Sequence, residues 1–205
     1  MEIQLNNIAK RFNTNWVFKN IDYSFSPGKT YAITGSNGSG KSTLLKILAA
    51  YFKPSKGEVK FLLNGEVIQE ENVFKHLVYC APYIDIEASF TLNEFFRFYF
   101  SIKKPKDNQS ITEVIEGIGL SNSAKKQLLD FSSGMLQKVK LAAAFNTEAR
   151  LYLFDEPTMN LDEENKKWFQ NNLNQISAES IVIIASNDEE EYQQANSLLD
   201  IGAFK

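Results

Sequence analysis

A run of eight residues near the N-terminal end has the types and spacing that bind phosphates. Residues 35–42 read Gly-Ser-Asn-Gly-Ser-Gly-Lys-Ser and match the pattern G-x-x-x-x-G-K-[ST] in full. Glycines let the backbone wrap closely around an anion, so that its N–H groups and the start of the next helix face the phosphates. Lys41 is expected to reach the β- and γ-phosphates, and the Ser42 hydroxyl to bind Mg²⁺.

The segments on either side of this loop distinguish a nucleotide site from an ordinary Gly/Ser turn. An apolar strand over residues 31–34 comes before the loop, and from Lys41 on apolar residues recur at the three-to-four spacing of a helix. This strand–loop–helix order is the context that the pattern requires. The predicted nucleotide-binding residues of the loop are Gly35, Ser36, Asn37, Gly38, Ser39, Gly40, Lys41, Ser42 and Thr43.

Two adjacent acids stand at the end of an apolar segment later in the chain. Residues 151–154 read Leu-Tyr-Leu-Phe and predict a buried strand, which Asp155 and Glu156 follow directly. A carboxylate at the carboxyl end of a strand, beside a phosphate loop, is suited to hold Mg²⁺, and this role falls to Asp155. Glu156 is placed to act as general base on a water that attacks the γ-phosphate. An acidic strand exit is the alternative, and the phosphate loop in the same chain favours the chemical role.

Strands and helices alternate along the chain in a way that could bring these groups together. A first helix is predicted to begin at Lys41 and to end by Lys53, and further helices are predicted over most of 92–145 and over 163–176. An Asn-Gly pair at 64–65 predicts a hairpin. Strands alternating with helices indicate an α/β core with a parallel sheet. The predicted strands cover residues 2–5, 17–25, 31–34, 58–63, 151–154 and 181–185.

Length and composition narrow the classes of protein. The 205 residues suit one domain, or one domain with a small inserted lobe, and 43% hydrophobic residues supply a core. A single cysteine excludes a disulfide scaffold and a multi-cysteine metal cluster. The net charge of −3 gives no overall attraction to nucleic acid, so no nucleic-acid partner is expected. The apolar segments are strand-sized and the N-terminus lacks a basic start, so neither a membrane span nor a secretory signal is predicted.

The order of four motifs resembles the nucleotide-binding domain of ABC (ATP-binding cassette) transporters. After the phosphate loop come Phe-Ser-Ser-Gly-Met-Leu-Gln at 131–137, here called the signature segment, then Phe-Asp-Glu-Pro-Thr at 154–158 and Asn-Leu-Asp at 160–162. Other phosphate-loop classes lack a signature segment just ahead of the Asp-Glu strand. The resemblance covers nearly the whole chain. It implies one domain over 1–205: an α/β P-loop NTPase core of the ABC ATPase type, with an N-terminal antiparallel β subdomain and an inserted helical subdomain near 90–145.

The resemblance also implies how ATP is bound and capped. An aromatic ring near the N-terminus stacks on adenine in this family, and Phe12 stands at the matching place, with Trp16 as a nearby competitor. Ser132 and Gly134 match the serine and the second glycine of the family signature, which contacts the γ-phosphate of ATP on the opposite protomer. Ser132 is also suited to cap a helix, and both roles are compatible. Asp162 lies in the loop that couples the two sites of a head-to-tail dimer.

Two positions depart from the family pattern. Tyr83 stands where the family has a glutamine near Mg²⁺ and the attacking water, and a phenol is a poor substitute for an amide carbonyl at a metal. Asn187 stands at the place of a switch histidine, where it can donate a hydrogen bond to the γ-phosphate but cannot carry a positive charge. We therefore expect ATP binding and dimer closure to be retained, and hydrolysis by the isolated protein to be slow.

The predicted function is that of an ATP-hydrolysing subunit of an ABC membrane transporter. The resemblance implies Mg²⁺ and ATP as cofactors, a second ATPase protomer, separate transmembrane permease subunits, and a peripheral position on the cytoplasmic face of the membrane. Part of the aromatic stretch 95–100 is expected to meet the membrane subunit, and the rest to pack in the core. The alternatives are an ABC-type ATPase acting on ribosomes or DNA and a nucleotide-gated module with almost no catalysis. A phosphate-loop kinase or GTPase is disfavoured by the signature segment.

Overall fold

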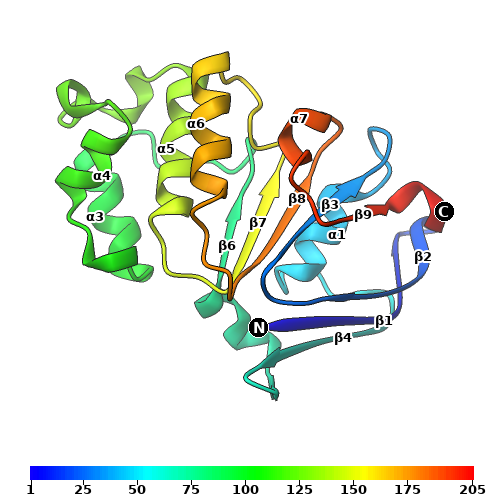
Figure 1. Cartoon of the computed structure of the whole chain (residues 1–205). Helices are drawn as coiled ribbons and strands as arrows, with labels where there is room; N and C mark the ends of the chain where they lie inside the picture. The colour runs from blue at the N-terminus through cyan, green and yellow to red at the C-terminus, as the bar shows by residue number, and fades with distance from the viewer. The chain divides into compact units, whose positions relative to one another are not determined.

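The computed structural model describes residues 1–205, which divide into two compact units. The first unit consists of Met1–Tyr79, Ala149–Glu156 and Ser177–Lys205, and the second of Cys80–Glu148 and Pro157–Ile176. The second unit is wider than the range 90–145, because its first segment begins at Cys80 and it also takes in the segment Pro157–Ile176 after the Asp-Glu strand. Figure 1 follows the elements of both units along the chain. None of the helices combines the length and apolar character that a membrane-spanning helix needs.

An antiparallel sheet in the first unit has the strand order β2-β1-β4-β5. The predicted hairpin at Asn64-Gly65 is confirmed: it joins β4 to β5, and both residues adopt the positive φ that a two-residue hairpin turn requires. The first strand is longer than predicted, because register shifts after Leu5 and again near Ile8 absorb residues that break the alternating pattern, and the strand continues beyond them. The strands are β1 (Glu2–Phe12), β2 (Asn15–Phe25), β4 (Lys56–Leu63) and β5 (Glu66–Ile68).

A second sheet in the first unit has the order β6-β7-β8-β3-β9, and its β7–β8, β8–β3 and β3–β9 pairs are parallel. Every residue of β7 and β8 is buried, which explains why both segments are continuously apolar. Helix α1 (Lys41–Leu48) packs on these two strands through Leu44, Leu45 and their apolar neighbours. The strands are β3 (Lys29–Thr34), β6 (Leu77–Cys80), β7 (Leu151–Asp155), β8 (Ile181–Ala185) and β9 (Ser197–Asp200).

The first unit also contains two short α-helices, α2 (Glu70–Val73) and α7 (Glu189–Tyr192). Strands β6 and β9, four residues each, were not predicted, because runs this short carry no clear alternation. The predicted parallel strands and the helix that follows the phosphate loop are confirmed. The α/β fold class is therefore confirmed as well.

The second unit is helical. Its helices are α3 (Leu92–Ile102), α4 (Ile111–Gly117), α5 (Ser133–Phe145) and α6 (Glu163–Leu173). Capping boxes start α3 and α4, since Thr91 and Ser110 each exchange hydrogen bonds with a glutamate three residues on. Helices α5 and α6 lie side by side, and Phe145 packs edge-on against Trp168.

The aromatic stretch 95–100 forms most of α3 and packs mainly inward. Phe95 and Phe96 are buried, and Phe96 stacks on Phe100 with ring centroids 5.8 Å apart. Phe98 differs from the others, because 54% of it is exposed. The stretch therefore serves the core of the second unit first, and leaves one large ring at the surface.

Candidate functional site

The loop 35–40 joins β3 to α1 and depends on glycine at two points. Gly35 has φ 136°, and a Cβ atom there would lie 2.8 Å from the Ser39 Oγ. Gly40 has φ 111° at the N-cap of α1, and a Cβ atom would lie 2.5 Å from a Val17 methyl carbon. Both positions combine a left-handed backbone with a close neighbour, so only glycine fits there without strain. The loop consequently turns tightly over the start of α1.

The environment of the Ser39 hydroxyl indicates which kind of ligand this loop would hold. Ser39 is 1% exposed, and its Oγ has no hydrogen-bond partner within the protein. A buried hydroxyl without a partner is costly, and such a group in a native fold needs an explanation. The first N–H groups of α1 are also without intrahelical partners, as in every helix. An anion seated in the loop would satisfy these donors together.

Lys41 is buried inside the same loop. It is 6% exposed, and its Nζ donates hydrogen bonds to the Gly35 carbonyl oxygen at 2.9 Å and to the Asn187 Oδ1 at 3.0 Å. The Glu156 Oε1 lies 3.8 Å from the same nitrogen. The ammonium group is thus held by two uncharged acceptors and one carboxylate. A phosphate entering the loop would offer a more negative partner.

The two acids lie at the carboxyl end of β7, but in different surroundings. Asp155 is 1% exposed, and its Oδ2 accepts a hydrogen bond from the Tyr79 hydroxyl at 3.3 Å. Glu156 is partly exposed and has φ 44°, a left-handed conformation that is uncommon for this residue type. Its N–H donates to the Ala185 carbonyl oxygen, and its Oε2 accepts from the Ser186 hydroxyl at 3.1 Å. The turn after Asp155 therefore directs the second acid toward the end of β8 and toward Lys41.

Asn187 completes this cluster from the end of β8. Besides accepting from Lys41, it donates from Nδ2 to the Asn37 Oδ1 at 2.6 Å. One amide thus connects the lysine with the middle of the phosphate loop. The structure brings together Asn37, Lys41, Glu156 and Asn187, all of which the sequence had singled out.

Two residues of this cluster were not predicted from the sequence. Ser186 holds Glu156, and Tyr79 holds Asp155. The sequence contains a weak signal for the first, since Ser186 directly follows a buried strand and directly precedes Asn187. The contact of Tyr79 follows from β6 lying next to β7 in the sheet, and no motif marks it.

The aromatic residues near the end of β1 differ in how accessible they are. Phe12 is 46% exposed and touches Phe52 edge-on, with ring centroids 5.8 Å apart. Trp16 is half-buried, and three cationic groups lie 5.5 Å from the centre of its ring. These groups belong to Arg11, Lys19 and Lys56. The Lys10 ammonium group also lies over the Phe12 ring, at 5.2 Å from its centre, so it is the greater exposure of Phe12 that favours it for stacking on a base.

Four of the predicted site residues belong to the second unit. Ser132 caps α5, as its Oγ accepts from the Met135 N–H at 3.2 Å, so its predicted capping role is confirmed. Asp162 caps α6 in the same way, accepting from the Asn165 N–H at 2.9 Å. The other two residues are Gly134 and Tyr83.

Gly134 and Tyr83 occupy contrasting places in the second unit. A Cβ atom on Gly134 would lie 2.7 Å from the Asn160 carbonyl oxygen, so glycine allows the start of α5 to approach that backbone. Tyr83 is 49% exposed. The carbonyl of its neighbour Pro82 accepts a hydrogen bond from the Lys140 ammonium group at 2.7 Å. Burial lowers the pKa of Lys140, while Cys80 and Asp85 act in the opposite direction.

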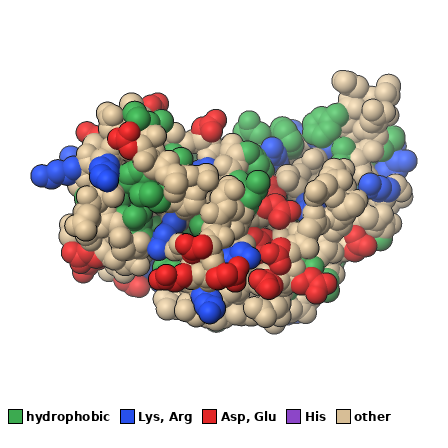
Figure 2. Space-filling view, turned by 90° about the horizontal axis from the view of Figure 1, so that it is seen from above, with side chains coloured by type: hydrophobic (Ala, Val, Ile, Leu, Met, Phe, Trp, Pro, Cys, Tyr) green, Lys and Arg blue, Asp and Glu red, His purple; other side chains and the backbone are tan.

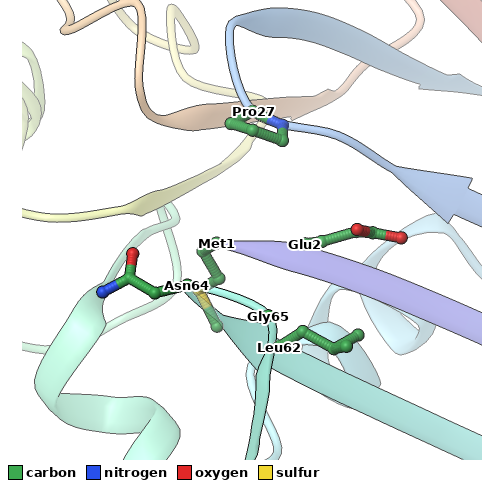
Figure 3. Close-up of a pocket in the computed structure, with 6 residues that line it drawn as sticks. All are labelled: Met1, Glu2, Pro27, Leu62, Asn64 and Gly65. Carbon is green, nitrogen blue, oxygen red and sulfur yellow. The ribbon is translucent and has the colours of Figure 1, made fainter.

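A separate pocket of about 230 Å³ opens near the N-terminus of the first unit. Figure 3 shows its lining residues, which come from the ends of β1 and β4 and from the turns beside them. They are Met1, Glu2, Pro27, Leu62, Asn64 and Gly65. None of the predicted site residues lines it, so this pocket is not the candidate nucleotide site.

Comparisons with known proteins agree on one family. The family model for "ABC transporter" matches residues 18–159. The energy-coupling factor transporter ATP-binding protein EcfA1 of Thermotoga maritima is 32% identical over 94% of this chain and 74% of its own length. A putative ABC transporter ATP-binding protein of Pyrococcus furiosus has the same fold, with a TM-score of 0.82 at 24% identity over the whole of both chains.

A further solved structure is a dimeric ATP-binding cassette in a post-hydrolysis state, bound to ADP and Pi. It matches with a TM-score of 0.82 at 20% identity, over 98% of this chain and 95% of that one. The family model covers more than half of the chain and includes both the phosphate loop and the Asp-Glu strand. This chain therefore belongs to the ABC transporter family, as an ATP-binding and ATP-hydrolysing subunit.

Proposed function

We propose that this chain powers transport through separate membrane-spanning subunits, from a peripheral position on the cytoplasmic face of the membrane. Two copies, or one copy and a related protomer, close on two ATP molecules and reopen after hydrolysis. One observation carries the proposal: a buried phosphate-loop lysine lies within 3.8 Å of the glutamate suited to act as general base. The membrane subunits are separate chains, and this chain supplies the nucleotide chemistry.

The first unit would bind the nucleotide. Phe12, half-exposed at the end of β1, stacks on the adenine ring. Backbone N–H groups of the loop and the buried Ser39 hydroxyl donate to the phosphates. Lys41 exchanges its contacts with Asn187 and Glu156 for the β- and γ-phosphate oxygens. The loop residues in this role are those from Gly35 to Thr43.

The donor groups present also fit Mg²⁺. The Asp155 carboxylate is buried at the end of β7, and Ser42 lies in the first turn of α1 with its hydroxyl. Mg²⁺ prefers a few such hard oxygen ligands and completes its shell with water and substrate phosphates. When bound, the ion neutralises charge that develops on the β- and γ-phosphate oxygens. Tyr83, which the sequence also predicts as a contributor, belongs to the second unit.

Glu156 would act on the attacking water. Once Lys41 turns to the phosphates, the Glu156 carboxylate can accept a proton from the water as its oxygen forms a bond to the γ-phosphorus. The bond between that phosphorus and the β–γ bridging oxygen breaks, which yields ADP and phosphate. Asn187 can donate from its amide nitrogen to a γ-phosphate oxygen, and the signature segment of the opposite protomer, with Ser132 and Gly134, caps the same group. Asp162 of the opposing copy lies in the loop that couples the two sites.

The second unit exposes apolar side chains that could meet the membrane partner. Large apolar side chains are exposed there, and Phe98 lies 5.7 Å from Phe90, ring to ring. The exposed ones in this unit are Tyr83, Phe98, Ile102, Leu129 and Met159. Figure 2 shows hydrophobic side chains that reach the surface on the face seen from above. Exposed apolar groups of this kind are typical of surfaces that bind another protein.

The decisive experiment uses the Glu156→Gln variant. We expect it to bind ATP, to form a dimer at saturating Mg²⁺ and ATP on size-exclusion chromatography, and to lose turnover. The wild-type protein alone should hydrolyse ATP slowly, because Tyr83 and Asn187 replace the groups that sense the γ-phosphate in the family. A variant that stays monomeric with ATP, or that hydrolyses at the wild-type rate, would contradict the proposal. Purification from native membranes should recover a multi-spanning protein; recovery with ribosomes instead would overturn the transport function.

A further inference from the structure

Ser186 occupies a buried position directly after β8, and its hydroxyl is fixed in orientation. The residue is 0% exposed, and its backbone N–H donates to the Ile33 carbonyl oxygen in β3. The Asp188 N–H donates to its Oγ at 2.9 Å, so that an oxygen lone pair is already in use. The hydroxyl proton is left to point at Glu156 Oε2, 3.1 Å away. Toward that carboxylate, Ser186 therefore acts only as a hydrogen-bond donor.

Glu156 is held to the same strand end by its backbone. Its N–H donates to the carbonyl oxygen of Ala185, the residue before Ser186, and its φ of 44° directs the side chain back over β8. A glutamate has three side-chain torsions, and a partly exposed one would otherwise sample many rotamers. Backbone and side-chain contacts to two consecutive residues restrict that freedom.

The two oxygens of the Glu156 carboxylate have different neighbours. Oε2 accepts from Ser186, whereas Oε1 faces the Lys41 ammonium group at 3.8 Å. When a phosphate draws Lys41 away, the contact through Oε1 is lost and the contact through Oε2 remains. Of the contacts with Lys41 and Ser186, only the one with Ser186 can therefore orient the carboxylate during the reaction.

We propose that Ser186 is a positioning residue for ATP hydrolysis: it holds Oε2 of Glu156 so that Oε1 is presented to the attacking water. The inference rests on the proposed role of Glu156 as general base. Ser186 itself touches neither nucleotide nor water in this scheme. Its neighbour Asn187 contacts the phosphate loop, so that the two residues after β8 align the base and the loop from one backbone segment.

The test compares Ser186→Ala with Ser186→Cys, which nearly keeps the shape of serine but donates a weaker hydrogen bond. We expect kcat to fall about tenfold in Ser186→Ala, the effect of losing one hydrogen bond to a charged group, and less in Ser186→Cys. KM and the equilibrium affinity for ATP, measured with a fluorescent analogue, should stay unchanged. A purely structural defect would instead lower affinity and kcat together.

A second readout is the lifetime of the ATP-bound dimer. Slower hydrolysis should prolong the ATP-bound dimer on size-exclusion chromatography in Ser186→Ala, by the same factor as the fall in kcat. In the Glu156→Gln background, adding Ser186→Ala should cause no further fall in the residual rate of ATP hydrolysis, because the carboxylate that the serine positions is already gone. A further loss in the double variant would overturn the inference.

The outcomes separate this inference from the proposed function. Wild-type kcat in Ser186→Ala together with an inactive Glu156→Gln would refute the positioning role alone. Full activity of Glu156→Gln would refute the general base, and the inference with it. If Ser186→Ala does not fold, as a thermal melt would reveal, Ser186→Cys decides: wild-type kcat in that variant contradicts the proposal, and a reduced kcat with unchanged ATP affinity supports it.

Discussion

The two units hold their candidate site residues by different kinds of contact. In the first unit, side chains far apart in the chain are joined directly, such as Asn37 with Asn187 and Lys41 with Asn187. In the second unit, Ser132 and Asp162 bind backbone groups only three residues away, at the start of their own helices. The first arrangement depends on the assembled sheet, whereas the second belongs to single helix ends.

This difference predicts which property each substitution changes. A long-range cluster positions groups for chemistry, so its variants should alter rate or affinity while the fold stays intact. A helix cap contributes to the stability of the helix that it starts, so its variants should alter the free energy of unfolding. Four substitutions test that separation, beginning with the largest expected effect.

Glu156→Gln should lower the rate of ATP hydrolysis by about 10²- to 10⁴-fold, the usual contribution of a general base. The amide keeps the size of the side chain but accepts a proton poorly, so ATP affinity and thermal stability should change little. A steady-state phosphate-release assay measures the effect. Glu66→Gln, on exposed β5, is the matched control and should behave like the wild type. Equal loss in both variants would show that the effect is not specific to the site.

Gly134→Ala should destabilise the second unit by about 1–3 kcal/mol, because the new methyl group would lie 2.7 Å from the Asn160 carbonyl oxygen. Formation of the ATP-bound dimer should fall as well, since the start of α5 would shift. Urea unfolding and size-exclusion chromatography measure the two effects. Gly117→Ala is the control: a Cβ atom there meets open space, and the change should be neutral or slightly stabilising. A Gly134→Ala protein as stable as Gly117→Ala would contradict the contact.

Tyr79→Phe should raise the Mg²⁺ concentration at half-maximal nucleotide binding by about tenfold, the lower end of the effect of removing a group that orients a metal ligand. The substitution keeps the ring and removes only the hydroxyl that donates to Asp155. A Mg²⁺ titration at fixed ATP analogue measures it, with Tyr51→Phe, an exposed tyrosine, as control. Binding in the absence of Mg²⁺ should not change; if it weakens equally, the hydroxyl acts on the fold rather than on the metal site.

Asp162→Ala should cost about 1 kcal/mol of unfolding free energy through loss of the cap on α6. Asp162→Asn should keep most of that stability, because asparagine caps a helix about as well as aspartate does. Thermal melts of the two variants measure the difference. If both variants lose ATP-dependent dimer formation equally while differing in stability, the carboxylate has the predicted second role at the dimer interface. Equal stability of the two would show that the cap contributes nothing.

Local patterns predicted the elements that carry the chemistry. The glycines of 35–40, the apolar residues of α1 and the continuous apolar runs of β7 and β8 were all visible in the sequence, because each depends on neighbours within a few residues. The end of β1 was missed for a related reason: its irregular register breaks the alternation on which strand prediction rests. Ser132 was identified as a helix cap from its position alone.

What the sequence determined by itself is the kind of chemistry: a loop for phosphates, two acids after a strand and a capped signature helix are encoded in residue types at fixed spacing. The tertiary structure alone decided which groups meet. Asp155 lies opposite Ala185 in the sheet, and that register brings Ser186 to Glu156 and Asn187 to Lys41. A hydrogen bond tolerates only a few tenths of an ångström, and a strand shifted by one residue turns every side chain to the other face. Such pairing is a property of the folded sheet, which no local pattern contains.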